Sequence, residues 1–155
     1  MRFSMKLISA LGAIVLALTG VTVQADSPKA GGTLIMSIGT TPRHLNPAVQ
    51  SGIATGAPGA QLFATLLRFD DKWNPHPYLA KSWQVSDDSR TVTFNLVEGA
   101  TFHDGTPITS NDVAFSIKTI KANHPFKTMF GAVESVGTPD ANTAVFKLSK
   151  PHPAL

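Results

Sequence analysis

The alternation of apolar and polar residues in the second half of the chain constrains its fold most strongly. Val92, Phe94 and Leu96 share one face of an extended segment, and the polar residues between them share the other. This period of two is typical of an antiparallel strand with one buried face. An Asp-rich turn over residues 87–90 joins it to a strand over 83–85, so the sequence predicts a hairpin of residues 83–97.

A second hairpin and a helix follow along the chain. Thr109 and Asp112 have the spacing of a capping box, which predicts a helix from Thr109 to about Ala122. Val113, Ile117 and Ile120 form its predicted buried stripe. Residues 133–136 and 143–148 predict the second hairpin around a turn over residues 139–142. Phe94, Phe115 and Phe146 fall on predicted core faces.

The segment before these hairpins contains shorter apolar stretches. Residues 33–39 alternate little, which predicts a buried strand, and the Pro and Gly residues over 40–58 predict a long loop. Leu62, Phe63, Leu66 and Leu67 recur at helical spacing after Pro58, so we expect a helix over 59–67. Residues 77–82 can form one further helical turn.

The first 25 residues have the organisation of an export signal. Arg2 and Lys6 precede an apolar stretch over residues 7–18, and Val23 and Ala25 occupy the two positions that a signal peptidase reads. An uncleaved membrane anchor is the alternative, but the strictly apolar run is short for a bilayer. We therefore expect cleavage after Ala25 and a periplasmic protein.

Removal of this signal changes the charge of the chain. The full sequence has 13 basic and 10 acidic residues, and 11 basic residues remain after residue 25, where all the acids lie. The net charge of about +1 gives no excess of Lys and Arg for a nucleic-acid partner. The sequence has no cysteine, which excludes a disulfide framework, a thiolate metal site, a Cys nucleophile and a lipidated N-terminal Cys.

Motifs of catalysis are not visible in the sequence. No two of the five histidines lie closer than 21 residues, and no motif of a Ser nucleophile or phosphate-binding loop occurs. The pairs Asp70–Asp71 and Asp87–Asp88 have the context of solvated turns. Trp73, Tyr78 and Trp83 could line a ligand surface or pack against the first hairpin. We expect neither a metal nor another cofactor.

Several segments together carry a resemblance to a known family. They are Gly31-Gly32-Thr33-Leu34, Leu45-Asn46-Pro47, Pro77 to Trp83, Val85 to Asp88, Thr93 to Leu96, Gly99 to Pro107 and Asp112 to Ser116. In this order they resemble the family 5 bacterial extracellular solute-binding proteins, which are receptors of ABC importers for oligopeptides, dipeptides and nickel. The specific part is the signature Phe102, His103, Asp104, Gly105, Thr106 and Pro107, followed by Asp112, Val113, Phe115 and Ser116. Gly105, Pro107 and the helix cap explain much of it as a folding motif.

The resemblance implies an α/β fold of the type II periplasmic-binding-protein kind, with two lobes and an extra subdomain on the first. Residues 26–72 would begin lobe I and residues 73–155 would form part of the extra subdomain. Lobe II would be absent, so the chain would be an N-terminal fragment. We expect the first strand and the helix over 59–67 to expose apolar surface, because most of their sheet would be missing.

The resemblance also implies binding without catalysis. We expect capture of a peptide or similar small solute by a receptor that is monomeric at full length, and delivery to an ABC permease complex at the inner membrane. The loop after the first strand should contribute ligand contacts through Thr40, Thr41, Pro42, Arg43 and His44. Thr41 stands where the family commonly has an acidic residue, which weakens the case for a cationic ligand. The alternatives are a periplasmic metal-dependent hydrolase using His103 and Asp104, and a sensory or chaperone-like binding module.

Overall fold

The computed structural model describes residues 30–152, so the predicted signal and its cleavage site lie outside the described residues. The chain divides into two units, Met1–Met36 and Ser37–Leu155. In the first unit, residues 30–36 form no helix or strand. The second unit contains every element named below. No helix within residues 30–152 is long and apolar enough to cross a membrane.

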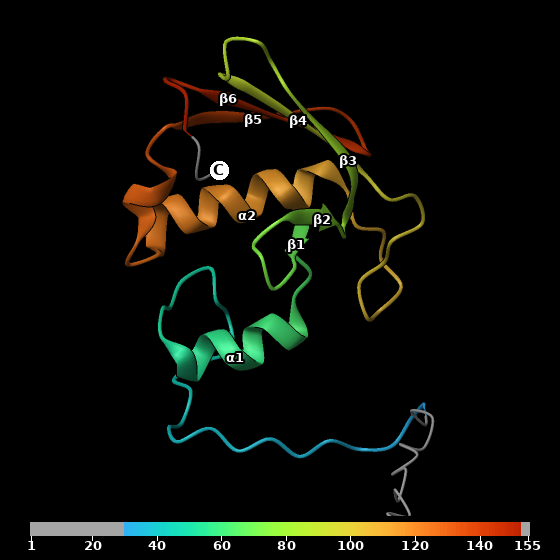
Figure 1. Cartoon of the computed structure of the whole chain (residues 1–155), viewed down its shortest axis with the longest axis vertical. Helices are drawn as coiled ribbons and strands as arrows, with labels where there is room; N and C mark the ends of the chain where they lie inside the picture. Colours follow the sequence, from blue (N-terminus) through green and yellow to red (C-terminus); the bar gives the residue numbers. More distant parts are fainter. Residues whose placement is uncertain (1–29, 153–155) are drawn as a thin grey trace, which may run out of the picture. The chain divides into compact units, whose positions relative to one another are not determined.

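Four antiparallel strands form the main sheet of the second unit. They are β3 (Ala80–Val85), β4 (Thr91–Leu96), β5 (Val133–Asp140) and β6 (Thr143–Leu148), in the order β3-β4-β6-β5 (Figure 1). Each hairpin thus places its second strand at the centre, where β4 pairs with β6. Both predicted hairpins are confirmed, although β3 and β5 are longer than expected.

Helix α2 (Ser110–Asn123) covers one face of this sheet. Val113 is buried and Ile117 is half-buried against the core, as the predicted stripe requires. The Ser110 hydroxyl donates to the Asp140 carbonyl at 2.5 Å, and the Lys121 ammonium donates to the Val133 carbonyl. Because these carbonyls lie at opposite ends of β5, the two bonds align the helix with this strand.

The core lies between α2 and the sheet. Phe94 and Phe146 meet edge-to-face, with ring centroids 5.2 Å apart, a geometry that aromatic pairs favour. The other buried apolar residues of this cluster are Ala80, Val92, Leu96, Val113, Val133, Ala144 and Leu148. The period of two in β4 therefore identified its buried face correctly. The unit is a mixed α/β structure, as expected.

Phe115 does not belong to this core, and its assignment to a buried face was wrong. Its side chain is 70% exposed. Two residues along a helix correspond to a rotation of about 200°, so Phe115 points away from the sheet that Val113 faces.

The shorter elements differ from the prediction. Helix α1 (Ile53–Leu62) begins and ends earlier than the expected helix over 59–67 and contains Pro58. After it, Leu66 and Leu67 pack against the core, and Leu67 begins β1 (Leu67–Phe69). This strand pairs with β2 (Pro75–Pro77) in a two-stranded sheet. The carbonyl of Leu66 also accepts the Ala80 amide, so tertiary pairing overrides the helical spacing of these leucines.

Two other local predictions were wrong. Residues 77–82 form no helical turn, because β2 ends at Pro77 and β3 begins at Ala80, where the backbone is paired with Leu96. Residues 33–39 form no strand. Leu34, Ile35 and Met36 are 80%, 90% and 65% exposed, and no strand among residues 30–152 pairs with them. The apolar exposure expected of this segment is therefore present.

Candidate functional site

The candidate ligand loop, residues 40–44, is open to solvent. Thr40, Thr41, Arg43 and His44 are exposed, and Pro42 is half-buried. Two hollows in the described part of the chain lie elsewhere, one beside Thr128 and Lys150 and one between α2 and β5. Residues 40–44 therefore offer one surface for contact rather than an enclosed cavity.

The residues that follow this loop hold it against α1. Thr55 is buried, and its hydroxyl donates to the His44 carbonyl at 3.0 Å. On the next turn of α1, Gly59 lets the Pro47 ring pack close to the helix, since a Cβ at this position would lie 3.0 Å from that ring. The Leu45-Asn46-Pro47 motif thus packs on a helix and positions the loop before it.

His44 has a defined orientation within the loop. Its Nδ1 accepts the Asn46 amide at 3.2 Å, so in the neutral ring Nε2 carries the proton. The Arg43 guanidinium forms no ion pair within residues 30–152. Together these two side chains present hydrogen-bond donors that suit a carboxylate or a peptide carbonyl.

The signature over 102–107 forms a tight turn. The Asp104 carboxylate accepts the Thr106 amide at 2.9 Å, the Phe102 amide donates to the Thr106 carbonyl at 2.8 Å, and Gly105 has φ of 86°. The hydrogen bonds from the Thr106 backbone and then its side chain lower the pKa of Asp104. These contacts close the turn upon itself, and the interpretation of the signature as a folding motif stays a prediction.

The second part of the signature starts α2. The Thr109 amide donates to Asp112 Oδ2 at 2.7 Å and the Thr109 hydroxyl donates to the same oxygen at 2.9 Å, in the predicted capping box. The Ser116 hydroxyl donates to the Asp112 carbonyl at 2.7 Å. Asp112 and Ser116 therefore serve the helix itself.

The described residues do not assemble the donor set of a metal-dependent hydrolase. No three His, Cys, Asp or Glu side chains lie together between residues 30 and 152. The Asp104 carboxylate accepts the Thr106 amide, and among the described residues no hydrogen bond or ion pair joins its side chain to that of His103.

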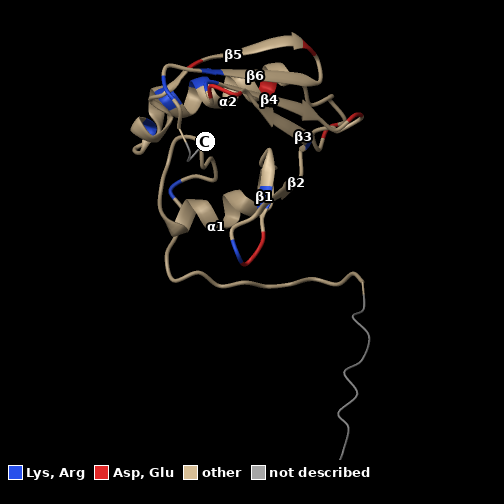
Figure 2. Cartoon of the chain, turned by 45° about the horizontal axis from the view of Figure 1, so that its top comes forward, with Lys and Arg blue, Asp and Glu red and all other residues tan. Residues whose placement is uncertain are grey.

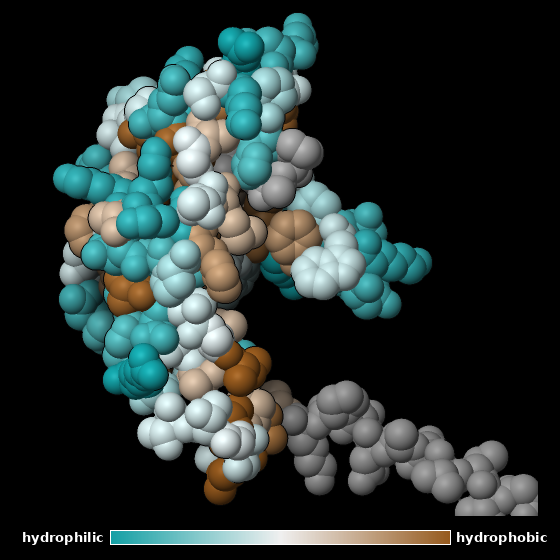
Figure 3. Space-filling view, turned by 90° about the vertical axis from the view of Figure 1, so that its left-hand side faces the viewer, coloured by the Kyte–Doolittle hydropathy of each residue, from teal (hydrophilic) through white to brown (hydrophobic). Residues whose placement is uncertain are grey.

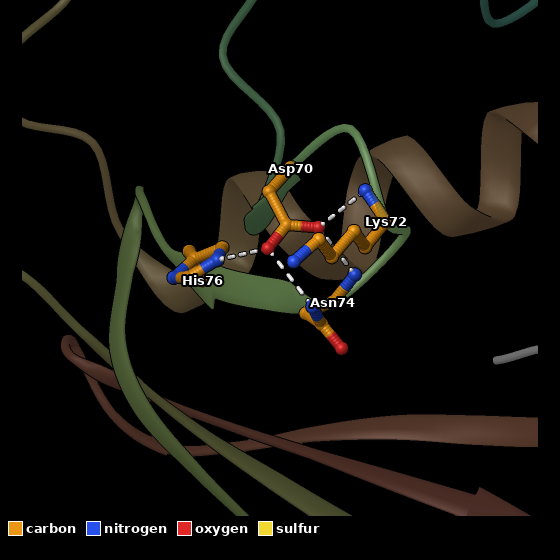
Figure 4. A network of polar contacts seen from close by, with 4 residues as sticks. All are labelled: Asp70, Lys72, Asn74 and His76. Atoms are coloured by element: carbon orange, nitrogen blue, oxygen red, sulfur yellow. Dashed lines mark hydrogen bonds and ion pairs between the residues drawn. The ribbon is translucent and has the colours of Figure 1, made fainter.

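A polar cluster in the β1–β2 turn escaped the sequence analysis (Figure 4). Asp70 Oδ1 accepts the amides of Lys72 and Asn74, at 2.9 and 2.8 Å. Oδ2 accepts Asn74 Nδ2 at 2.9 Å and faces His76 Nε2 at 3.1 Å. The Asn74 side chain first, and then His76, hold the pKa of Asp70 well below its usual range. The prediction that Asp70 lies in a turn was correct, but local sequence spacing gave no sign of its contact with His76.

The three aromatic residues around this turn have different environments. Trp83 is half-buried against the core, whereas Tyr78 is 54% exposed. Trp73 is 81% exposed, has φ of 64° and lies 6.3 Å from the Phe69 ring. Packing against the hairpin is therefore confirmed for Trp83 alone.

The fold and the signature define the class of protein. Residues 74–155 match the sequence profile of the bacterial extracellular solute-binding proteins, family 5, middle region. The chain therefore belongs to this family.

Individual relatives support the assignment. An ABC transporter peptide-binding protein of Brucella ovis is 36% identical over 116 residues, which are 72% of this chain and 21% of the relative. The D,D-dipeptide-binding periplasmic protein DdpA of Escherichia coli is 31% identical over 157 aligned residues, which cover 97% of this chain and 30% of DdpA. The chain thus spans less than a third of the length of these relatives.

The structure also matches solved members of this class. NikZ from Campylobacter jejuni, solved in complex with Ni(L-His), superposes with a TM-score of 0.67 and 30% identity. The match covers 74% of this chain and 24% of NikZ. The chain therefore has part of the periplasmic-binding-protein fold, over about a quarter of that structure.

Proposed function

We propose that this chain is part of the substrate-binding component of an ABC importer, which captures a peptide in the periplasm and delivers it to a membrane permease. The observation that carries the proposal is the 36% identity to the Brucella peptide-binding protein across 72% of this chain. The identity to a D,D-dipeptide-binding periplasmic protein supports the same ligand class and compartment. Binding and release complete this function, with no catalytic step.

In this proposal the chain supplies one side of a bilobal receptor of type II. Residues 26–72 begin lobe I, and residues 73–155 form part of its extra subdomain. The remaining lobe belongs to a longer parent protein, because the relatives are several times longer than this chain. The exposed apolar residues 34–36 and Leu62 support this division, since lobe I would need further structure to cover them.

The loop over residues 40–44 would provide ligand contacts on lobe I. Its support is the exposed Arg43 and the His44 ring oriented by Asn46. Ligand held by this loop and by the second lobe would favour the closed state, because both sets of contacts exist only there. The permease would then receive the closed, loaded receptor.

The test is the thermal stabilisation of the complete receptor, expressed from the whole open reading frame, by short peptides. Ni(L-His) serves as the probe for the other ligand class. We expect di- to pentapeptides to raise the Tm, and Arg43→Ala to weaken peptide binding by roughly 10- to 100-fold, the usual effect of losing one charged hydrogen bond.

Arg68→Ala is the matched control, since Arg68 is an exposed arginine of β1 outside the loop. Equal stabilisation of the Arg43→Ala and unaltered receptors would remove this loop from the binding site. Stabilisation by Ni(L-His) and by none of the peptides would overturn the peptide assignment. A reading frame that ends at codon 155 would contradict the longer parent.

A further inference from the structure

Positive charge is concentrated in the last third of the described chain. Residues 113–152 contain five lysines and two acidic residues, whereas residues 30–112 contain five basic and seven acidic residues. Figure 2 shows the lysines of this part at the end of α2, in the turn after it and on the adjoining strands. The two ion pairs within residues 30–152 are His76–Asp70 and Lys81–Glu98, so none of these five lysines is neutralised by a carboxylate there.

A short turn places two apolar side chains among these charges. The 3-10 helix η1 (Lys127–Phe130) follows α2, and its start is fixed by His124, whose carbonyl accepts the Lys127 amide and whose Nδ1 accepts the Phe126 amide. Phe126 is the N-cap residue of η1 and Met129 lies within it, and the Met129 amide donates to the Phe126 carbonyl at 3.0 Å. They are 57% and 59% exposed, while Phe130 packs against the core and anchors the turn.

Other lysines line two hollows, one on α2 and one on η1. Lys118 and Lys121 line the hollow between α2 and β5, together with Glu134 as its one acidic residue. Lys150 lines the hollow beside Thr128, together with His152. Lys121 is half-buried and its ammonium is bonded to the Val133 carbonyl. We call the set of Lys118, Lys127, Lys150, Phe126 and Met129 the basic corner. Figure 3 shows apolar and hydrophilic side chains interleaved on the side of the molecule that includes this end of α2.

We propose that the basic corner binds peripherally to the surface of an anionic phospholipid bilayer. Lysine ammonium groups pair with lipid phosphates over a short range, and each contributes to membrane affinity. Phe126 and Met129 would enter the boundary between headgroups and acyl chains, where apolar side chains flanked by lysines are favoured. A soluble polyanion would use the charges alone. The exposed apolar pair on the same turn therefore favours a bilayer over such a partner.

This contact would be weak and reversible. Three lysines with one acidic neighbour give an electrostatic attraction that salt screens within about 10 Å at ordinary ionic strength. Two partly inserted side chains add a small apolar contribution. Such a contact would hold the protein near a membrane without inserting any helix.

The test is co-sedimentation with lipid vesicles of the exported form of the chain, starting at Asp26, so that the apolar leader makes no contribution. We expect binding to vesicles of phosphatidylglycerol and phosphatidylcholine in equal amounts, with much less binding to phosphatidylcholine alone. Lys127→Ala should lower the partition constant about fivefold. The double variant Phe126→Ser, Met129→Ser should lower it roughly tenfold. Circular dichroism verifies that each variant keeps its secondary structure.

Matched controls lie elsewhere on the surface. Lys72→Ala removes a lysine from the β1–β2 turn, and Phe115→Ser removes an aromatic residue that is 70% exposed. Both should bind the vesicles as the unaltered chain does. Equal losses in the controls, or equal binding to both kinds of vesicle, would overturn the proposal. Sensitivity to Lys127→Ala without sensitivity to the double variant would also overturn it, because this pattern fits a soluble polyanion.

Discussion

The Asp70 carboxylate receives hydrogen bonds from both the backbone and the side chain of Asn74, and it also faces His76. These contacts hold its pKa in the folded chain below the value of an unfolded aspartate, near 3.9. The folded state therefore binds fewer protons than the unfolded state at acidic pH. The stability that Asp70 contributes is complete above the unfolded pKa and is lost as pH falls toward the folded pKa.

Asp70→Asn should accordingly lower the urea midpoint at pH 7, and its effect should shrink progressively as pH falls below the unfolded pKa, because the unaltered chain loses this contribution there. The measurement is urea unfolding, followed by circular dichroism, over a pH series. Asp71→Asn is the control, since Asp71 accepts no side-chain hydrogen bond within residues 30–152. An equal pH dependence for both variants would contradict the role of the Asp70 cluster.

Single residues also show where sequence patterns mislead. Val113 and Phe115 both belong to the family signature, yet one is buried and the other is 70% exposed. Helical rotation alone separates them, whereas apolar character had suggested a shared core. Asp70 was placed correctly in a turn, but its contact with His76 depends on the β1–β2 pairing of Arg68 with His76, which local sequence does not reveal.

At the scale of elements, α1 contains a matched pair of glycines. A Cβ on Gly56 would meet no atom within 4 Å, whereas a Cβ on Gly59 would lie 3.0 to 3.1 Å from three atoms of the Pro47 ring. Replacing a helical glycine by alanine stabilises a helix by roughly 0.5 to 1 kcal/mol where space permits. At Gly59 the rigid proline opposes this gain, because a displaced Pro47 would strain the loop held at His44 by Thr55.

We therefore expect Gly56→Ala to slow hydrogen exchange of the α1 amides and Gly59→Ala to accelerate it. Hydrogen–deuterium exchange read by mass spectrometry over residues 53–62 distinguishes the two. Slower exchange in both variants would mean that Pro47 yields without cost, and that the contact does not hold the candidate ligand loop.

The elements with strong local signals were predictable from the sequence. The β4 alternation and the Thr109–Asp112 cap each reside in a few adjacent residues, so β4 and α2 were found near their actual bounds, whereas β3 and β5 were predicted too short. The three-residue strands β1 and β2 are too short for a period, and their position depends on packing of Leu66 and Leu67. The candidate loop came from the family resemblance, and its support by Thr55 and Gly59 became visible only in the structure.

At the scale of the whole molecule, the chain combines a well-packed part with segments that lack cover. The sheet and α2 bury a continuous apolar cluster, whereas Leu34, Ile35 and Met36 remain exposed. The chain spans less than a third of the length of these relatives. Apolar surface of this kind would stay exposed if the elements that cover it belonged to the rest of a longer parent protein. The candidate ligand loop follows this uncovered segment in the sequence.

The first 25 residues form the predicted export signal. Val23 and Ala25 are small enough for the two positions that a signal peptidase reads, and Gln24 lies between them. We expect the exported protein to begin at Asp26, and Ala25→Leu to prevent processing because a bulky residue would not fit at the cleavage position. Gln24→Leu should be processed normally, since this position is not read. Intact-mass measurement of the periplasmic fraction distinguishes these outcomes. Efficient processing of Ala25→Leu, or a different first residue, would show that the cleavage site lies elsewhere.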